Sequence, residues 1–383
     1  MPPLLLAAPW IAFPLLVPLL LRKRPRLRDF QPAAGAQPLV SIIVPARNEA
    51  INIGPCLATL QNSCYQNKEI IVVDDGSTDA TGDVARAFAE RTSAALRVVE
   101  TAPLPSGWIG KSWACWTGYQ EARGELLLFT DADTRHDQDL LALAVGALDQ
   151  SGVSLLTLLP RQIMESFWER VVLPHVFLGI SLRFASVSHI NRTRNPRQVL
   201  ANGQFLLMPR ASYERMDGHQ AVRHDVVEDV ALAQHVIVSG ERLLLLHAPD
   251  YIETRMYRSL PEIIEGWSKN LALGMRRTVP ALLAPVIIWF SVLLGLLLWV
   301  VPPTVLLGSL FLGELAPYRV WALYASAASL AGWLYVNLSM RSGITAAVLF
   351  PIGSLLTCFL MARSALRGSR VVWRGRTYDV PAI

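Results

Sequence analysis

The chain has 383 residues, of which 52% are hydrophobic and 17% are charged. This length and apolar content exceed what one soluble domain needs, so we expect a globular part combined with membrane segments. The net charge of +5 comes from 31 arginines and four lysines. No basic strand with interleaved aromatic residues and no recognition helix accompanies this charge, which excludes nucleic acid as the expected partner and favours a membrane surface.

The N-terminal region has the pattern of a membrane anchor. Residues 3–21 carry no charge, are long enough to span a bilayer, and are followed by the basic sequence RKRPRLR at 22–28. A signal peptide is the alternative, but its positive charge would precede the apolar stretch, and no small-residue cleavage site follows it. We therefore predict an anchor with a basic flank over 1–28. The positive-inside rule then makes this an integral inner-membrane protein whose remaining chain faces the cytoplasm.

After a short linker at 29–38, apolar runs alternate with helical patterns from Leu39 onward. The predicted strands cover 39–46, 69–75, 96–100 and 125–133, and the predicted helices cover 49–62, 79–92 and 111–123. Alternating βα units of this length indicate an α/β fold, with a mostly parallel sheet and helices on both faces. Thr78 to Thr81 offers N-cap chemistry for the second helix, and Gly76 permits a positive φ in the turn before it.

Pairs of carboxylates follow two of these strands directly. Asp74 and Asp75 end the second strand, and Asp131 and Asp133 end the fourth, so both pairs should lie at the ligand-binding edge of the sheet. In an extended backbone Asp131 and Asp133 would point to the same side, where two carboxylates can bind Mg²⁺ or Mn²⁺ and, through the ion, a phosphorylated substrate. The alternatives are a solvated acidic loop for this pair and helix capping for Asp74 and Asp75. His136 is a possible further ligand, although a surface histidine is the simpler interpretation.

Residues 162–190 are apolar but carry too many charges for a comfortable membrane span. A helix lying in the membrane interface fits this composition, and a buried core helix is the alternative. In either case Pro174 should kink or break the helix.

The C-terminal third is predicted to be membrane-embedded. Three apolar blocks, at 279–313, 320–339 and 344–362, precede a basic tail at 363–383. Three simple crossings would leave this tail outside, whereas its arginines favour the cytoplasm. We therefore interpret the first block, which Pro302 and Pro303 interrupt, as a hairpin or as one span with a re-entrant half-helix.

Two of the four lysines fall in distinctive segments, Lys111 in GWIGKSWA and Lys269 in EGWSKN. Because the chain otherwise uses arginine for positive charge, these compact charges suit contacts to a diphosphate or a nucleotide. Trp267 in the second segment would stack on a sugar or nucleotide, or anchor the chain at the membrane interface.

Four segments then carry a family resemblance: SIIVPARNEA, IIVVDDGSTDAT, GKSWACWTGYQEARGELLLFTDADT and VEDVAL. In this order they resemble the family 2 inverting glycosyltransferases with the GT-A fold, which implies such a domain over 39–275. TAPLPSGWIGKSWA and the ending VVWRGRTY are further similar to membrane-bound members that act on polyisoprenoid lipids, the hopanoid-biosynthesis-associated and carotenoid glycosyltransferases.

The resemblance implies roles for individual residues. Pro45, Arg47 and Glu49 would cradle the donor nucleoside, and Asp74 and Asp75 would contact its base and ribose. Asp229 would be the general base that deprotonates the acceptor, with Glu228 pointing elsewhere. For Glu49 the alternative is an ordinary place in the first helical turn. For Glu228 and Asp229 it is an acidic pair stabilised by the helix dipole.

The predicted function is transfer of a hexose from a UDP- or GDP-sugar to a membrane lipid such as a hopanoid, a carotenoid or another polyisoprenoid or sphingoid lipid. One alternative is a processive polysaccharide synthase, which the missing Gln-x-x-Arg-Trp motif at 265–270 disfavours. Another is an inactive lipid-binding protein with a GT-A-like domain, which the intact acidic segments disfavour. A nucleotidyltransferase would need a Gly-rich loop near the first strand, and none is present.

Overall fold

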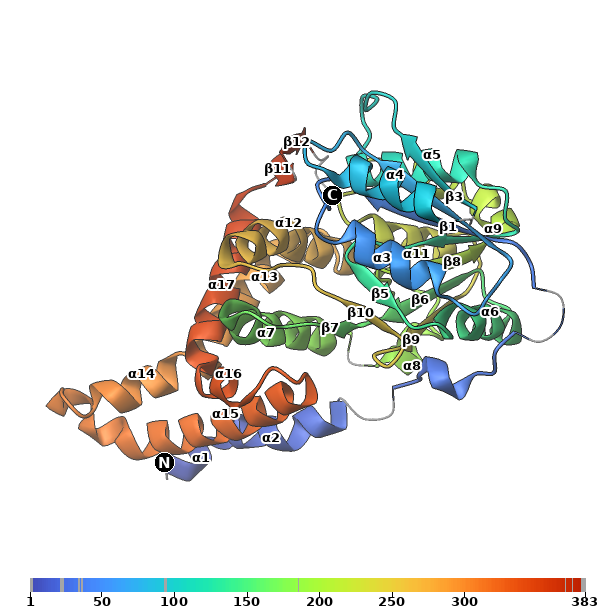
Figure 1. Cartoon of the computed structure of the whole chain (residues 1–383). Coiled ribbons are helices and arrows are strands. Elements are labelled where there is room, and N and C mark those ends of the chain that lie inside the picture. Colours follow the sequence, from blue (N-terminus) through green and yellow to red (C-terminus); the bar gives the residue numbers. More distant parts are fainter. Residues whose placement is uncertain are drawn as a thin grey trace.

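The computed structural model describes residues 3–20, 24–33, 35, 37–92, 95–184, 186–368, 370–373 and 375–379 (Figure 1). It contains an α/β domain and, beside it, a group of helices from both ends of the chain. The N-terminal helices lie next to C-terminal helix α15, far from the strands that follow them in sequence.

A seven-stranded sheet forms the centre of the α/β domain, in the order β3-β2-β1-β4-β8-β6-β9. Its strands are β1 (Val40–Ala46), β2 (Lys68–Asp74), β3 (Leu96–Glu100), β4 (Leu126–Phe129), β6 (Leu155–Leu159), β8 (Leu206–Pro209) and β9 (Leu243–His247). Only β8 runs antiparallel to its neighbours, so the prediction of a mostly parallel sheet is confirmed. A second sheet in the order β5-β10-β7 joins Thr134–His136, Ile252–Thr254 and Arg161–Gln162.

Helices cover both faces of the large sheet, because its strands are apolar on both sides. Ile42 and Val44 point into one core, with α3 (Ile53–Gln61), α4 (Thr81–Arg91) and α6 (Leu140–Ser151). Ile43 points into the opposite core, with α5 (Gly110–Glu121), α9 (Arg210–Arg215) and α11 (Glu228–Val238). Alternation of neighbouring strand residues between two cores is the arrangement expected of a sheet buried on both faces.

Three local predictions need correction. The strand predicted over 125–133 ends at Phe129, so Asp131 to Asp133 lie in a turn. Thr78 does not cap α4; instead the Asp79 carboxylate accepts hydrogen bonds from the backbone amides of Thr81 and Ala50, at 3.0 and 3.2 Å. The helix expected from residue 49 begins at Ile53. The positive φ predicted for Gly76 is confirmed at 64°.

The remaining elements form the helical group, short connections and a C-terminal hairpin. The longer helices are α2 (Ala8–Leu20), α7 (Phe167–Arg183), α12 (Leu260–Thr278), α13 (Ala284–Trp299), α14 (Val301–Gly308), α15 (Arg319–Ser339) and α17 (Phe350–Leu366). Short helices are α1 (Pro3–Leu6), α8 (Val187–Ile190), α10 (Gly218–Ala221), α16 (Ile344–Val348), η1 (Leu27–Asp29), η2 (Pro196–Gln198) and η3 (Gly313–Tyr318). The hairpin pairs β11 (Arg370–Trp373) with β12 (Arg376–Asp379).

Helix α7 connects the helical group to the α/β domain. It continues through Pro174, so the predicted break is absent, and the alternative of a kink stays a prediction. Its apolar residues pack against α12 and α17, and at its start the buried Glu169 accepts two hydrogen bonds from Arg255, each at 3.0 Å. Since charge-assisted bidentate pairs fix geometry, this contact orients α7 on the domain. The structure thus gives α7 a packed core face, and its position in a membrane interface stays a prediction.

Within the described residues, one helical run is long and apolar enough to cross a membrane, Ala284–Gly308. It comprises α13 and α14, which meet at Val300, so the predicted hairpin in this block is wrong. The N-terminal apolar stretch forms the 13-residue α2, which is shorter than a span and packs along α15. Trp10 contacts Trp321 edge to face in this packing, with ring centroids 5.4 Å apart.

Candidate active site

A cavity of about 480 Å³ lies between the α/β domain and the helical group. Ten of the eleven predicted site residues line it: Pro45, Arg47, Glu49, Asp75, Lys111, Asp131, Asp133, Asp229, Trp267 and Lys269. Asp74 does not. Its carboxylate accepts a hydrogen bond from the Ser77 amide at 2.9 Å, inside the turn after β2. Segments that are far apart in sequence therefore meet at one site, and the edge of the sheet brings them together.

The turn after β4 places Asp131 and Asp133 in the cavity wall. Burial and the neighbouring carboxylates of Asp131 and Glu49 raise the pKa of Asp133 to about 7, and burial also raises the pKa of Asp131. Part of this negative charge is neutralised by Lys111, whose Nζ lies 2.7 Å from Asp131 Oδ1. Buried hard oxygens with excess negative charge are what a divalent cation needs.

His136 is neither a surface residue nor a neighbour of the cavity. It is buried, and its Nε2 lies 3.0 Å from the hydroxyls of both Thr130 and Thr134. Burial lowers its pKa to about 3, so the ring is neutral. In the described part of the chain, no group of three or more His, Cys, Asp or Glu side chains could hold a metal ion alone. A cation here would depend on the two aspartates and on oxygens from a substrate.

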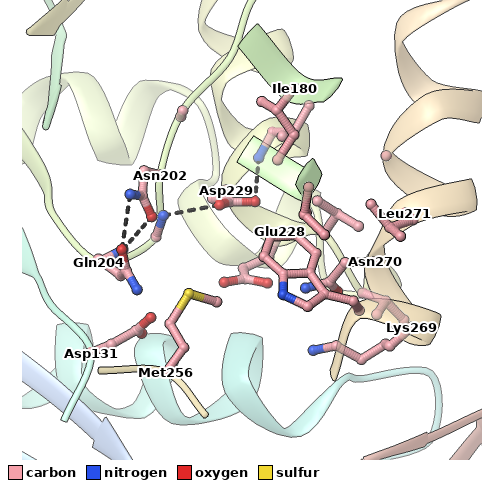
Figure 2. A pocket seen from close by; sticks show the side chains of 18 of the residues that line it. Asp131, Ile180, Asn202, Gln204, Glu228, Asp229, Met256, Lys269, Asn270 and Leu271 are labelled. Carbon is pink, nitrogen blue, oxygen red and sulfur yellow. Dashed lines mark hydrogen bonds between the residues drawn. The ribbon is translucent and has the colours of Figure 1, made fainter. Parts of the chain in front are cut away.

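The first turn of α11 presents two acids that have different partners. Glu228 Oε1 lies 2.8 Å from Lys111 Nζ, and this ion pair turns Glu228 towards α5. Asp229 instead accepts hydrogen bonds from the amides of Gly203 at 2.9 Å and Val230 at 2.7 Å (Figure 2). Burial and the adjacent Glu228 charge raise the pKa of Asp229 to about 6. Against the effect of burial, Lys111 lowers the pKa of Glu228, so Asp229 has the higher affinity for a proton of the two acids.

Lys111 and Lys269 have different electrostatic environments. Burial alone would lower the pKa of Lys111, but Asp131 and Glu228 raise it well above its usual range. At Lys269, the effect of burial is larger than that of the nearby carboxylates, and it lowers the pKa to about 8. Lys111 therefore holds the acidic residues together, and Lys269 adds a positive charge on the α12 side of the cavity.

A hydrogen-bond chain joins the two acidic sites. The Gln204 side chain donates to Thr254 Oγ1 at 3.1 Å, and that hydroxyl donates to Asp133 Oδ1 at 3.2 Å. Gln204 also bonds the side chain of Asn202, as Figure 2 shows. The turn at 202–204 thus contacts Asp133 through Gln204 and Asp229 through the Gly203 amide. No pattern in the sequence indicates this link between the turn and the two carboxylates.

The helical group contributes mostly apolar side chains to the cavity. They come from α7, α12 and α17 and include Val176, Phe177, Ile180, Leu271, Met275 and Met361. Trp267 is 6% exposed and packs edge-on against Phe177 and Tyr257, with centroid distances of 5.7 and 6.3 Å. It is therefore held in the protein interior and does not act as an exposed interfacial anchor.

Comparison with known proteins identifies a family for part of the chain. Residues 41–216 match the family model described as "Glycosyl transferase family 2". Residues 41–216 thus form a family 2 glycosyltransferase domain. The chain is 26% identical to the 4,4'-diaponeurosporenoate glycosyltransferase of Staphylococcus aureus (strain USA300), over 89% of this chain and 88% of the relative. The Staphylococcus haemolyticus protein of the same name is 26% identical over 65% of each chain.

One solved structure supports the fold along nearly the whole chain. It is the mannosyltransferase PcManGT from Pyrobaculum calidifontis in complex with GDP-Man and Mn²⁺, which aligns with a TM-score of 0.56 at 21% identity. The alignment covers 95% of this chain and 97% of that one. The predicted GT-A fold of the glycosyltransferase is therefore confirmed, including its mostly parallel sheet.

The glycosyltransferase also has a site contact that sequence reasoning missed. Arg376 of β12 lies beside Asp75, with 2.5 Å between Nη1 and Oδ2, and Tyr378 lines the cavity. The tail at 363–383 was predicted as a basic cytoplasmic segment, without this contact to the α/β domain; its cytoplasmic location stays a prediction. The sequence signal was the ending VVWRGRTY, which resembles membrane-bound family members but does not reveal a partner. Of the tail, Ser369, Arg374 and residues 380–383 lie outside the described residues.

Proposed function

We propose that this enzyme transfers a hexose from a UDP- or GDP-sugar to the polar end of a lipid acceptor at the membrane. The acceptor group is a hydroxyl or a carboxyl, and the lipid class is that of carotenoids, hopanoids or related polyisoprenoids. The observation that carries the proposal is one continuous cavity that is lined both by acidic residues of the α/β domain and by apolar side chains of the helical group. A water-soluble sugar acceptor would gain nothing from the apolar part, whereas a lipid chain would be buried there.

Named relatives support this choice of substrates. The curated relatives act on 4,4'-diaponeurosporenoate by name, and the structural relative was solved with GDP-Man and Mn²⁺. In this chain Pro45, Arg47, Glu49 and Asp75 line the donor side of the cavity. We assign them to the nucleoside, and Lys111 and Lys269 to the diphosphate.

The residues present fit a divalent cation. Asp131 and Asp133 are two positions apart in one turn and both half-buried, and carboxylate oxygens are the ligands that Mg²⁺ and Mn²⁺ prefer. We propose that these two side chains hold the ion together with donor diphosphate oxygens. When bound, it would supply Lewis-acid stabilisation of the leaving nucleoside diphosphate.

Asp229 then acts as the general base for a hydroxyl acceptor. Its carboxylate takes the hydroxyl proton while the acceptor oxygen forms a bond to the anomeric carbon from the face opposite the diphosphate. The bond from that carbon to the diphosphate oxygen breaks, and its electron pair leaves with the nucleoside diphosphate. The configuration is inverted, so an α-linked donor gives a β-linked product. The raised pKa of Asp229, about 6, makes it a better base than an ordinary aspartate.

We further propose that the helical group places this site at the cytoplasmic leaflet of the inner membrane. Exposed apolar side chains gather on α2, α13, α14 and α15, such as Leu16, Phe290, Leu307 and Leu323, whose exposed fractions are 53%, 60%, 61% and 53%. Soluble surfaces rarely expose so many large apolar groups on adjoining elements. Lipid contact on these helices would bring the apolar part of the cavity next to the acyl chains, where acceptors are concentrated.

The experiment is lipid mass spectrometry on cells with and without the gene, followed by assays with the purified enzyme. A single hexose-sized mass added to one lipid class, and formed again from UDP- or GDP-hexose with Mn²⁺, would support the proposal. Long sugar polymers without a lipid acceptor would instead indicate a processive synthase. No hexose transfer to any lipid would contradict the assignment.

A further inference from the structure

The C-terminal hairpin docks on the donor side of the cavity and not on the outer surface of the helical group. Arg376 contacts Asp75 twice: Nη1 lies 2.5 Å from Oδ2, and Nη2 donates to the Asp75 carbonyl at 3.2 Å. The other carboxylate oxygen, Oδ1, accepts a hydrogen bond from Thr101 at 3.2 Å. The Asp75 side chain is only 5% exposed, so Arg376 compensates the charge of a buried acid.

Tyr378, two residues along the same strand, also faces the protein. It is 9% exposed, packs with Val226 and Leu273, and lines the cavity. Thr377 between them is exposed. This alternation follows the period of a strand, and it shows that one face of β12 is built to lie against the domain.

Gly110, the first residue of α5, gives the hairpin the space to dock. A Cβ atom at this position would lie 2.6 Å from Asp75 Oδ2 and 2.9 Å from both Arg376 Nη1 and the Tyr378 hydroxyl. The next residue is Lys111, which contacts Asp131. Asp75, Arg376, Tyr378 and the start of α5 therefore meet at one point, directly beside the proposed diphosphate contacts.

We propose that the hairpin is a wall of the donor site, and that Arg376 is a positioning residue that holds Asp75 for the nucleoside. This inference rests on the proposed nucleotide-sugar donor. A guanidinium contacts the side chain and the carbonyl of Asp75 with two separate N–H groups, which fixes its orientation better than a single charge would. The docked hairpin would hold Asp75 in the orientation that the nucleoside needs. Docking of the hairpin and binding of the nucleoside should therefore favour each other, by the same factor.

The test measures binding of UDP and GDP, each with Mn²⁺, to the full-length protein by isothermal titration calorimetry. In Arg376→Ala, the affinity for the nucleotide that the wild type binds should fall by about tenfold or more. This is the size expected for a lost charge-assisted hydrogen bond. Arg376→Lys should recover part of that loss. Thr377→Ala, on the exposed face of the same strand, should bind within about twofold of wild type, since surface changes usually cost little.

Two further measurements test the proposal. The first separates positioning of Asp75 from direct phosphate binding, and the second tests the coupling between the hairpin and the nucleotide. The monophosphates UMP and GMP should lose the same factor in Arg376→Ala, because Asp75 serves the nucleoside; a loss confined to the diphosphates would overturn the positioning role. In wild type, bound nucleotide should slow amide exchange of residues 370–379, and unchanged exchange would overturn the coupling. Equal affinities of wild type and Arg376→Ala would overturn the inference alone. If wild type bound neither nucleotide, the proposed donor would fail, and the inference with it.

Discussion

The backbone amide of Gly203 donates a hydrogen bond to Asp229 Oδ2 at 2.9 Å. This contact holds the carboxylate at the cavity wall while Glu228, its neighbour, pairs with Lys111. A Cβ at Gly203 would lie 2.9 Å from Lys111 Nζ and 3.2 Å from Glu228 Oε1, so a side chain there would displace the ion pair. The turn before β8 thus gives the two adjacent acids different environments: a backbone amide holds Asp229, the proposed base, and Lys111 holds Glu228.

The first prediction concerns the base itself. Asp229→Asn should lower kcat by about 10²–10⁴, because the amide keeps the shape but cannot accept the acceptor's proton. Donor binding should change little, since the proposed role of Asp229 is contact with the acceptor. The measurement is initial-rate kinetics beside nucleotide titration, with Asp149→Asn, an exposed change at the end of α6, as control. Unchanged turnover would remove Asp229 from the mechanism.

The second prediction is a pH profile with an acidic limb. The base form of Asp229 is lost as the pH falls through about 6, so kcat for a hydroxyl acceptor should drop roughly tenfold per unit below that value. Glu228 raises this pKa, so Glu228→Gln should shift the limb to lower pH. A limb that moved to higher pH in this variant would contradict the electrostatic account of the pair. An acceptor that is already a carboxylate would show no such limb.

The third prediction links metal binding to stability. The pKa of Asp133, raised to about 7, means that the folded state holds this proton more tightly than the unfolded chain does. Protonated Asp133 therefore contributes to stability fully below the ordinary aspartate pKa, and this contribution is lost as the pH rises through 7. A bound cation should replace the proton, so Mn²⁺ should raise Tm more at pH 8 than at pH 5.5.

Asp133→Asn provides the control for this metal effect. The variant should melt higher than wild type at pH 8 without metal, because the buried negative charge is gone, and it should lose most of the response to Mn²⁺. Thermal scans with Mn²⁺, Mg²⁺ and a chelator give both comparisons. An equal Mn²⁺ response in the variant and in wild type would place the cation elsewhere.

Sequence reasoning predicted the part of the fold that local patterns encode. The short apolar runs at β1, β2 and β4 predict strands of a buried sheet. Acids that follow such strands lie at the carboxyl edge of the sheet. The same reasoning predicted the wrong backbone for Asp131 and Asp133. They follow β4 in a turn and not in an extended strand, although both side chains line the cavity. Composition alone does not distinguish these backbones.

The contacts that were missed join distant segments. Arg376 and Asp75 are 301 positions apart in sequence, and no local pattern around either residue predicts their contact. An arginine-rich tail after apolar helices satisfies the positive-inside rule whether its arginines face lipid or protein. Similarly, α7 has the composition of an interfacial helix, and only the packing of α12 and α17 against it reveals its buried face.

The final prediction tests the apolar part of the cavity. Gly274 of α12 lines it, and a Cβ at this position would meet no atom within 4 Å, so a larger side chain would extend into open space and not into the protein. Gly274→Leu should therefore leave folding and nucleotide binding intact while raising the KM for the lipid acceptor by about tenfold, because it fills volume that the lipid chain needs. Gly313→Leu makes the same change at an equally open position outside the cavity and should not affect KM. If the KM for the acceptor stayed constant in Gly274→Leu, the lipid would have to approach Asp229 by another route.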